Sequence, residues 1–131
     1  MENLRSRILY FNRFNSDTHM IIDHRTYTIH PGKLNDFVKI YQELGWPVQT
    51  KYLGDCRGWY ISMDIGELNQ VVHLWGYKDI TDRAERRAKM NVDKDWQEYL
   101  KQATPFLQKW KTRLLRLHLF TNPEASYQIW V

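Results

Sequence analysis

The pattern of apolar and polar positions divides most of the chain into alternating strand-like and helix-like segments. Four short runs are rich in β-branched, leucine or aromatic residues and predict strands: Met20–Ile29, Gly58–Ile65, Leu68–Tyr77 and Thr112–Leu119. After the first run, apolar residues recur at the spacing of one helix face: Leu34, Phe37, Val38, Tyr41 and Leu44. Gly45 and Pro47 predict the end of this helix, and Thr50–Leu53 then reads as a short extended piece.

The second half of the chain repeats this alternation. Gly66-Glu67 predicts a tight turn that joins the second and third strands into an antiparallel hairpin. Asp79 predicts the N-cap of a helix over Asp79–Met90, and Asp93 that of a further helix, with a kink or break at Pro105. The resulting order, β-α-β-β-α-β, is that of a ferredoxin-like α+β domain with a four-stranded antiparallel sheet and both helical segments on one face.

All of these predicted elements lie within residues 20–119, which we expect to form the folded domain. We expect residues 1–19, which show no clean period, to be a flexible N-terminal extension, and residues 120–131 to be a C-terminal tail. A length of 131 residues suits one domain of this kind.

Alternation along the strands predicts which side chains the helices cover. In the third strand, Val72, Leu74 and Gly76 form the smaller apolar set, which we expect to face the helices. We likewise expect the last strand to turn its odd-numbered leucines to the helices: Leu115, Leu117 and Leu119. The sheet face without helices would then present the larger, amphipathic side chains: His73, Trp75, Tyr77, Arg116 and His118. The first strand leaves its own orientation open, because Ile29 suits the helix side whereas Arg25 does not.

Large rings on an uncovered sheet face predict a partner. Two copies of the chain packed sheet to sheet would remove these rings from water and form a two-fold homodimer. A space enclosed between two such sheets, lined by rings with polar tips, would suit a small molecule.

The same segments resemble the NIPSNAP family. The resemblance runs over about residues 20–119 and rests on these motifs: Arg25-Thr26-Tyr27-Thr28, Pro31-Gly32-Lys33, Leu53-Gly54, Ile65-Gly66-Glu67-Leu68-Asn69, Val71-Val72-His73-Leu74-Trp75-Gly76-Tyr77, Asp82-Arg83, Arg87-Ala88, Asp93, Trp96 and Pro105. It implies a dimeric α/β barrel of ferredoxin-like subunits, but no defined activity and no catalytic residues. His24 departs from the apolar residue that the family usually has there.

Composition and charge narrow the function classes. A net charge of +4 is too small to indicate a nucleic-acid partner, and no apolar run approaches the length of a membrane span. Cys56 is the only cysteine, so an intrachain disulfide is excluded and we expect a cytoplasmic protein. The five histidines show no metal-ligand spacing and no C-x-x-C is present, so we expect neither a metal nor a cofactor.

The candidate site residues are the polar groups placed among the rings. His73 is the candidate base or ligand-binding group, since imidazole titrates near neutrality; the alternative is a hydrogen-bonded structural histidine. Arg25 and Tyr27 could hold an anionic or enolic ligand, or Arg25 could instead pair with Asp23, Asp64 or a helix carboxylate. The other candidate ligand-binding residues are Trp75, Tyr77, Arg83, Arg87 and His118. Arg83 and Arg87 share one helix face and could instead contact a partner subunit or the solvent.

Two functions remain open on the sequence alone. The first is a protein that binds a small apolar or aromatic molecule in the barrel cleft, including a cofactor-independent enzyme with His73 as its base. The second is a non-enzymatic dimeric interaction or scaffold protein, in which the rings fill the interface and His73 is fully bonded to its neighbours.

Overall fold

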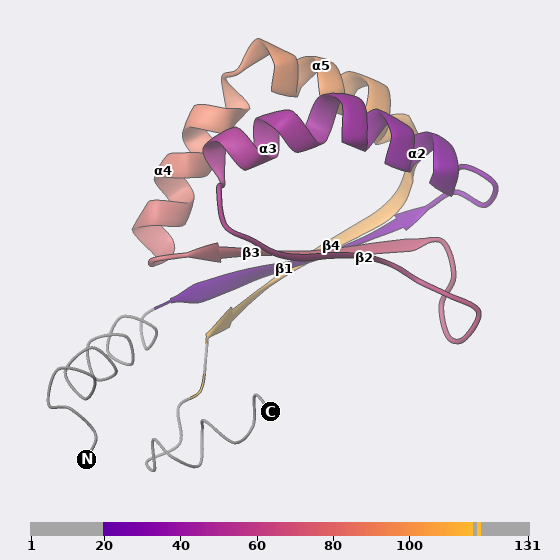
Figure 1. Ribbon diagram of the computed structural model, residues 1–131, viewed down its shortest axis with the longest axis horizontal. Helices are drawn as coiled ribbons and strands as arrows, with labels where there is room; N and C mark the ends of the chain where they lie inside the picture. Colours follow the sequence, from indigo (N-terminus) through magenta and orange to yellow (C-terminus); the bar gives the residue numbers. More distant parts are fainter. Residues whose placement is uncertain (1–19, 117, 119–131) are drawn as a thin grey trace, which may run out of the picture.

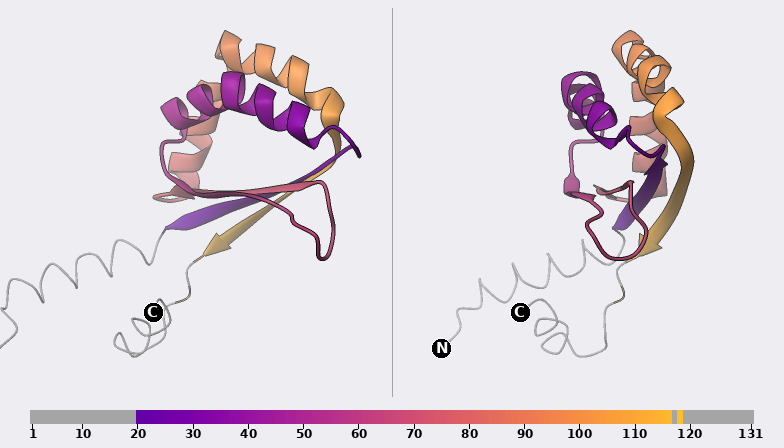
Figure 2. Two further views of the ribbon diagram at one scale, coloured as in Figure 1. Left: turned by 45° about the vertical axis from the view of Figure 1, so that its right-hand side comes forward. Right: turned by 90° about the vertical axis from the view of Figure 1, so that its right-hand side faces the viewer.

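The fold is a four-stranded antiparallel sheet with helices on one face (Figure 1). The structure is a computed structural model that describes residues 20–116 and 118, so the predictions made for residues 1–19 and 120–131 lie outside it. The strands are β1 (Ile21–Ile29), β2 (Cys56–Ile61), β3 (Gln70–Tyr77) and β4 (Leu107–Arg116), in the order β2-β3-β1-β4. This confirms the predicted α+β, ferredoxin-like architecture. Figure 2 shows from two further directions that the helices lie on one side of the sheet.

The first helical segment is longer than predicted. It runs through α2 (Leu34–Ile40), a π-helical turn (Tyr41–Gly45) and α3 (Trp46–Tyr52), so the predicted end at Gly45 and the predicted extended piece at Thr50–Leu53 were wrong. Pro47 is accommodated because it lies in the first turn of α3, where its missing N–H costs little. Gly45 is needed for packing, not for termination. A Cβ there would lie 2.8 Å from ring carbons of Tyr41 and Tyr99.

The later helices begin where the sequence predicts. Asp79 caps α4 (Ile80–Asn91) by accepting a hydrogen bond from the Asp82 N–H. Asp93 caps α5 (Lys94–Ala103) in the same way through the N–H groups of Asp95 and Trp96. The predicted break at Pro105 is a 3₁₀ turn, Thr104–Phe106, that leads directly into β4.

Several strand boundaries differ from the prediction, including the start of β2, which is Cys56 rather than Gly58. The β2–β3 pair is antiparallel as expected, but residues 62–69 form a loop rather than a two-residue turn. In this loop the backbone of Asp64, Gly66 and Asn69 has positive φ, a left-handed conformation that Gly, Asn and Asp adopt more readily than other residues. The last strand starts at Leu107, five residues before the predicted Thr112, because the 3₁₀ turn already reverses the chain.

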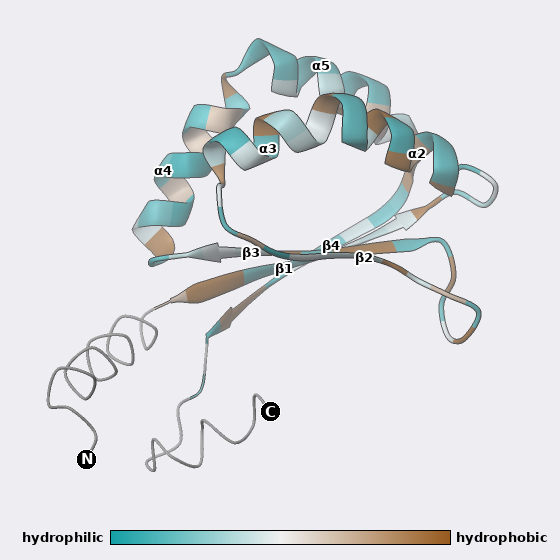
Figure 3. Ribbon diagram, viewed as in Figure 1, coloured by the Kyte–Doolittle hydropathy of each residue, from teal (hydrophilic) through white to brown (hydrophobic). Residues whose placement is uncertain are grey.

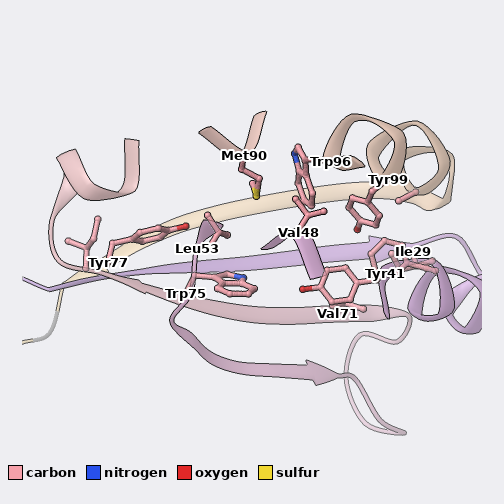
Figure 4. Packing of buried hydrophobic residues seen from close by; sticks show 13 residues of the cluster. Ile29, Tyr41, Val48, Leu53, Val71, Trp75, Tyr77, Met90, Trp96 and Tyr99 are labelled. Carbon is pink, nitrogen blue, oxygen red and sulfur yellow. The ribbon is translucent and has the colours of Figure 1, made fainter. Parts of the chain in front are cut away.

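The structure reverses the predicted assignment of the sheet faces. His73 and Trp75 are both 0% exposed and Tyr77 is 1% exposed, and all three lie on the side that the helices cover. In Figure 4, Trp75 and Tyr77 point from the sheet toward Leu53, Val48 and Met90. Leu114 and Arg116 pair with Asp23 and Ile21 on this same side.

The uncovered face, which we call the outer face, carries the smaller side chains. Its half-buried or exposed apolar members are Ile22, Tyr60, Val72, Leu74 and Leu115. Polar residues alternate with them on β1 and β4: His24, Thr26, Thr28, Lys109, Lys111 and Arg113. The predicted orientation was wrong because large rings on a sheet can be covered by helices of the same chain as well as by a second subunit. The rings of the helical layer already provide that partner, since Tyr41, Trp96 and Tyr99 are buried against the inner face.

The surfaces of α4 and α5 are largely hydrophilic, as Figure 3 shows. Buried residues on them are few and face the sheet: Met90, Trp96, Tyr99 and Ala103. Within residues 20–116, no helix is long and apolar enough to cross a membrane.

Candidate functional site

Polar groups gather on the inner face of the sheet beneath α4, some fully buried and others half-buried. We call this cluster the inner site: Asp23, Arg25 and Tyr27 on β1, His73, Trp75 and Tyr77 on β3, and Arg83 and Arg87 on α4. Alternation along β1 and β3 places the strand residues on one side, and the register pairs Asp23 with Trp75 and Arg25 with His73. Arg83 and Arg87 reach them from one face of α4, at a spacing of one helical turn.

The protonation state of His73 is fixed by its neighbour Trp75. The indole Nε1–H of Trp75, which can only donate, donates a hydrogen bond of 2.8 Å to Nδ1 of His73. Nδ1 is therefore the acceptor nitrogen, and the neutral ring must hold its proton on Nε2. That Nε2–H is buried and has no hydrogen-bond partner among the described residues. In His73, Nδ1 is therefore hydrogen-bonded, whereas the Nε2–H is a buried donor that is not used.

The surroundings of His73 disfavour its charged form. Burial, followed by the positive charges of Arg25 and Arg87 and a smaller contribution from His24, lowers the pKa of His73 to about 3. In this neutral imidazole Nε2 already carries the proton, and the lone pair of Nδ1 accepts the hydrogen bond from Trp75. Neither nitrogen is therefore free to take a proton from a substrate. The geometry therefore favours a hydrogen-bond donor over the base that the sequence predicted.

Asp23 joins strand β1 to helix α4 in the inner site. Its side chain is 0% exposed, and its Oδ2 accepts a hydrogen bond of 3.0 Å from Nε of Arg83. Nε of Arg25 lies 3.6 Å from the other oxygen, Oδ1, which is an ion pair without a hydrogen bond. Of the alternatives left open for Arg25, the structure shows the pairing with Asp23.

Arg87 has no such carboxylate. Among the described residues, no Asp or Glu oxygen lies within the 4.0 Å of an ion pair, and its NH1 atom is buried without a hydrogen bond. Burial and the charge of Arg25 lower the pKa of Arg87, while the nearby Tyr77 hydroxyl and the more distant Asp23 carboxylate favour its charged form. The Tyr77 hydroxyl is itself buried without a partner, and burial raises its pKa. The inner site therefore holds several polar hydrogens that this chain leaves unbonded.

Aromatic rings form the wall around these groups. The Tyr27 ring centroid lies 4.9 Å from that of His73, and the Tyr41 ring stacks on Trp59 at 5.0 Å. The indole N–H of Trp59 is another buried donor without a partner. Burial raises the pKa of Tyr27 and of Tyr41, so both rings stay neutral phenols.

One side of the inner site opens beside β4. Trp110, Thr112 and Leu114 pair with Tyr27, Arg25 and Asp23, so they lie along the rim of the cluster. They remain exposed, with Trp110 64% and Leu114 44% accessible. The side chain of Arg83 is 24% accessible, so the cluster is not sealed from solvent.

Seven of the eight candidate residues from the sequence meet in this cluster: Arg25, Tyr27, His73, Trp75, Tyr77, Arg83 and Arg87. Of these, His73, Trp75 and Tyr77 lie on the opposite side of the sheet from the predicted one. His118 does not join them, since it is exposed and follows the end of β4, well beyond the Thr112 that pairs with Arg25. Sequence reasoning named Asp23 only as one possible partner of Arg25, and it missed both the pairing of Asp23 with Arg83 and the polar role of Trp59. Only the position of Asp23, two residues before Arg25 on a strand, could have indicated its place in the cluster.

A separate open pocket of about 280 Å³ lies at the end of β3. Tyr77 contributes to both places, but the pocket is otherwise lined by residues outside the cluster: Met20, Leu53, Gly54, Asp55, Gly76, Lys78, Asp82 and Arg86. Most of its charged groups are paired, because Arg86 pairs with Asp82, and Asp55 pairs with Arg57 next to the pocket. The unbonded groups of the inner site make that cluster the better candidate. Within residues 20–116 and 118, no three His, Cys, Asp or Glu side chains are grouped as metal ligands.

Comparison with known proteins agrees with the sequence motifs. The family model described as NIPSNAP matches residues 22–122. The chain belongs to the NIPSNAP family. A NIPSNAP family protein from Agrobacterium tumefaciens is 37% identical with a TM-score of 0.73, over 80% of this chain and 98% of that one. An uncharacterized NIPSNAP-like domain protein from Burkholderia xenovorans is 38% identical with a TM-score of 0.73, over 81% and 91%.

Two more distant similarities assign no activity to this chain. Protein NipSnap homolog 2 of Danio rerio is 26% identical over 96 residues, which are 72% of this chain and 32% of the relative. The chain thus spans about a third of that curated relative. A candidate antibiotic biosynthesis monooxygenase from Caulobacter crescentus shares the fold at 14% identity and a TM-score of 0.56.

The buried neutral His73 should make the stability of this NIPSNAP protein depend on pH. The unfolded chain takes up a proton near the ordinary pKa of 6.5, whereas the folded chain does so only near about 3. The free energy of unfolding should therefore fall as the pH falls below about 6.5. The loss due to His73 should reach about 2 kcal/mol between pH 7.5 and pH 5.

Urea unfolding of the native protein and of His73→Phe at both pH values measures this effect, since all other titrating groups are common to the two proteins. The native protein should lose about 2 kcal/mol more than the variant over this interval. An equal loss in both proteins would show that His73 titrates normally and would contradict the described environment.

Proposed function

We propose that this NIPSNAP protein binds a small organic molecule in the inner site, between the sheet and α4. The observation that carries the proposal is the buried Nε2–H of His73, which has no partner within residues 20–116 and 118. A buried donor without a partner costs about 1–3 kcal/mol, a cost that a bound acceptor would remove. The hydroxyl of Tyr77 and the indole N–H of Trp59 are buried in the same condition.

The kind of molecule follows from the wall of the site. Tyr27, Trp75 and Tyr41 offer ring surface next to His73, and Trp110 extends this surface to the open rim. Ring walls with few convergent polar groups are typical of small-molecule sites. We therefore assign an apolar or aromatic body to the ligand, with at least one acceptor oxygen for His73.

The scaffold alternative requires rings that fill their surroundings and a fully bonded His73. The rings next to His73 are indeed packed, since Trp75 is 0% exposed, so the bonding of His73 is the feature that separates the two functions. The Trp75 hydrogen bond satisfies only one of the two ring nitrogens, which favours the binding function. Should the ligand also react, His73 would act as a positioned donor that polarises an oxygen, since its Nδ1 is occupied.

Two pairs of aromatic probes test the binding function: benzamide with benzoate, and 2-naphthamide with 2-naphthoate. We expect at least one probe to shift the ring resonances of His73 and the indole resonance of Trp75 saturably in ¹H–¹⁵N NMR titrations. His73→Phe keeps an aromatic ring but removes the donor, so it should weaken binding about tenfold. His30→Phe, at an exposed position outside the site, is the matched control and should bind as the native protein does.

Failure of all four probes to perturb His73 or Trp75 would overturn the binding function. Equal affinity of the native protein and His73→Phe would instead remove His73 from it.

We also propose that the outer face forms a homodimer. Ile22 and Leu115 form an apolar row across β1 and β4, and Leu74 lies next to it on β3. No helix covers this row, and Leu115 is 40% exposed. A second copy packed on the same face would remove it from water, and a two-fold arrangement is the commonest way to do so.

Light scattering after size-exclusion chromatography tests the dimer at micromolar concentration. The native protein should have twice the mass of the 16.0 kDa chain. Leu74→Arg should shift it to the monomer because it places a charge in the apolar row. The control Val92→Arg, at an exposed position between α4 and α5, should remain a dimer. A monomeric native protein, or a dimeric Leu74→Arg, would contradict the proposed interface.

A further inference from the structure

The charges of the inner site do not balance. It contains three guanidinium groups, Arg25, Arg83 and Arg87, but Asp23 is its only acidic residue with an ion pair to any of them. The neutral His73 adds no charge. The site therefore has an excess of two positive charges in a place that is largely removed from water.

Other acidic residues near α4 do not compensate this excess. Asp82 is already paired with Arg86 at 2.8 Å and accepts a hydrogen bond from the Lys78 N–H, while Asp79 caps the helix. Glu85 lies on the exposed side of α4 and forms no ion pair with the cluster. Burying unpaired charge is unfavourable, so an uncompensated Arg87 is a cost to the folded chain by itself.

We propose that the ligand of the inner site is an organic carboxylate, held by Arg87 and Arg25 and oriented by His73. This inference rests on the proposed binding function and adds the charge of the ligand to it. A carboxylate has the planar pair of oxygens that guanidinium groups bind best, and it accepts hydrogen bonds without donating any. The unbonded groups match this requirement, since Arg87 NH1, Arg25 Nε and His73 Nε2 all present hydrogens.

The body of this carboxylate is assigned by the same geometry. Asp23 pairs with Arg25 and Arg83 at one end of the cluster, whereas Tyr27 and Trp110 pair with each other farther along β1 and β4. A molecule with its carboxylate on Arg87 would place its other end against these rings. We therefore assign an aromatic or apolar body, rather than a free inorganic anion such as phosphate.

Three proteins test the charge requirement. Arg87→Gln removes the unpaired charge, Arg87→Lys keeps it, and Lys89→Gln removes an exposed positive charge from the same helix as a matched control. Each is titrated at pH 7 with benzoate and benzamide, with 2-naphthoate and 2-naphthamide, and with inorganic phosphate, again following His73 and Trp75 by NMR.

We expect each carboxylate to bind the native protein at least about tenfold more tightly than its amide. Arg87→Gln should abolish this preference and leave amide binding within about twofold. Arg87→Lys should retain part of the preference, and Lys89→Gln all of it. Phosphate should not compete with the carboxylates, because it has no apolar body.

The failures of the two proposals are distinguishable. Equal binding of carboxylate and amide at His73 would overturn the carboxylate assignment and leave the binding function standing. Phosphate binding as tight as that of the carboxylates would also overturn it, because an adventitious anion would then suffice. No binding of any aromatic probe would overturn both proposals.

A second measurement does not need a ligand. Arg87→Gln should have a melting temperature equal to or above that of the native protein, because it removes a buried charge without a partner. A variant that fails to fold, or melts well below the native protein, would show that Arg87 is needed for the fold itself and would overturn its assignment to the ligand.

Discussion

The hydrogen bond from the Trp75 indole to Nδ1 of His73 determines what the interior of this protein can do. It joins two residues on the same side of β3, so it requires both to be turned away from the outer face of the sheet. It fixes the proton of the neutral imidazole on Nε2 and directs an unused donor into the cluster beneath α4. Strand β3 therefore carries both residues that determine the protonation state of the inner site.

Asp23 links the strand residues of the inner site to helix α4 through ion pairs. Its buried carboxylate binds Arg83 of α4 and lies next to Arg25 of β1, so the ion pairs hold the helix over the sheet at the position of the site. The same arrangement leaves Arg87 without a carboxylate. Burying such a group is unfavourable by itself, and under the proposed function a bound carboxylate would supply the missing charge.

The sequence predicted the order of the elements well because that order depends on local signals. The caps Asp79 and Asp93 and the break at Pro105 act within one helical turn, and they are found where the sequence places them. Gly45 misled the prediction, because its role is to admit the Tyr99 ring from α5, a contact between residues far apart in the chain. Pro47 was likewise tolerated at the start of a helix turn, where the sequence suggested an end.

The residues of the site could be predicted, but not the side of the sheet on which they lie. Alternation groups His73 with Trp75 and Tyr77, but only the rings of the helical layer, such as Tyr41 and Tyr99, decide which face of the sheet they cover. The unpaired state of Arg87 was beyond sequence reasoning for the same reason, since it depends on where Asp23 and Asp82 find their partners. Family membership adds the fold but no activity, so the function rests on this geometry.

The most direct test of the account is the protonation state of the His73 ring in the protein without added ligand, measured from its ¹⁵N chemical shifts and one-bond ¹H–¹⁵N coupling at pH 7. The account predicts a neutral ring with its proton on Nε2, an unprotonated Nδ1 that accepts from Trp75, and no change of state down to pH 5. A proton on Nδ1, or a charged imidazolium at either pH, would contradict the arrangement on which the inner site depends.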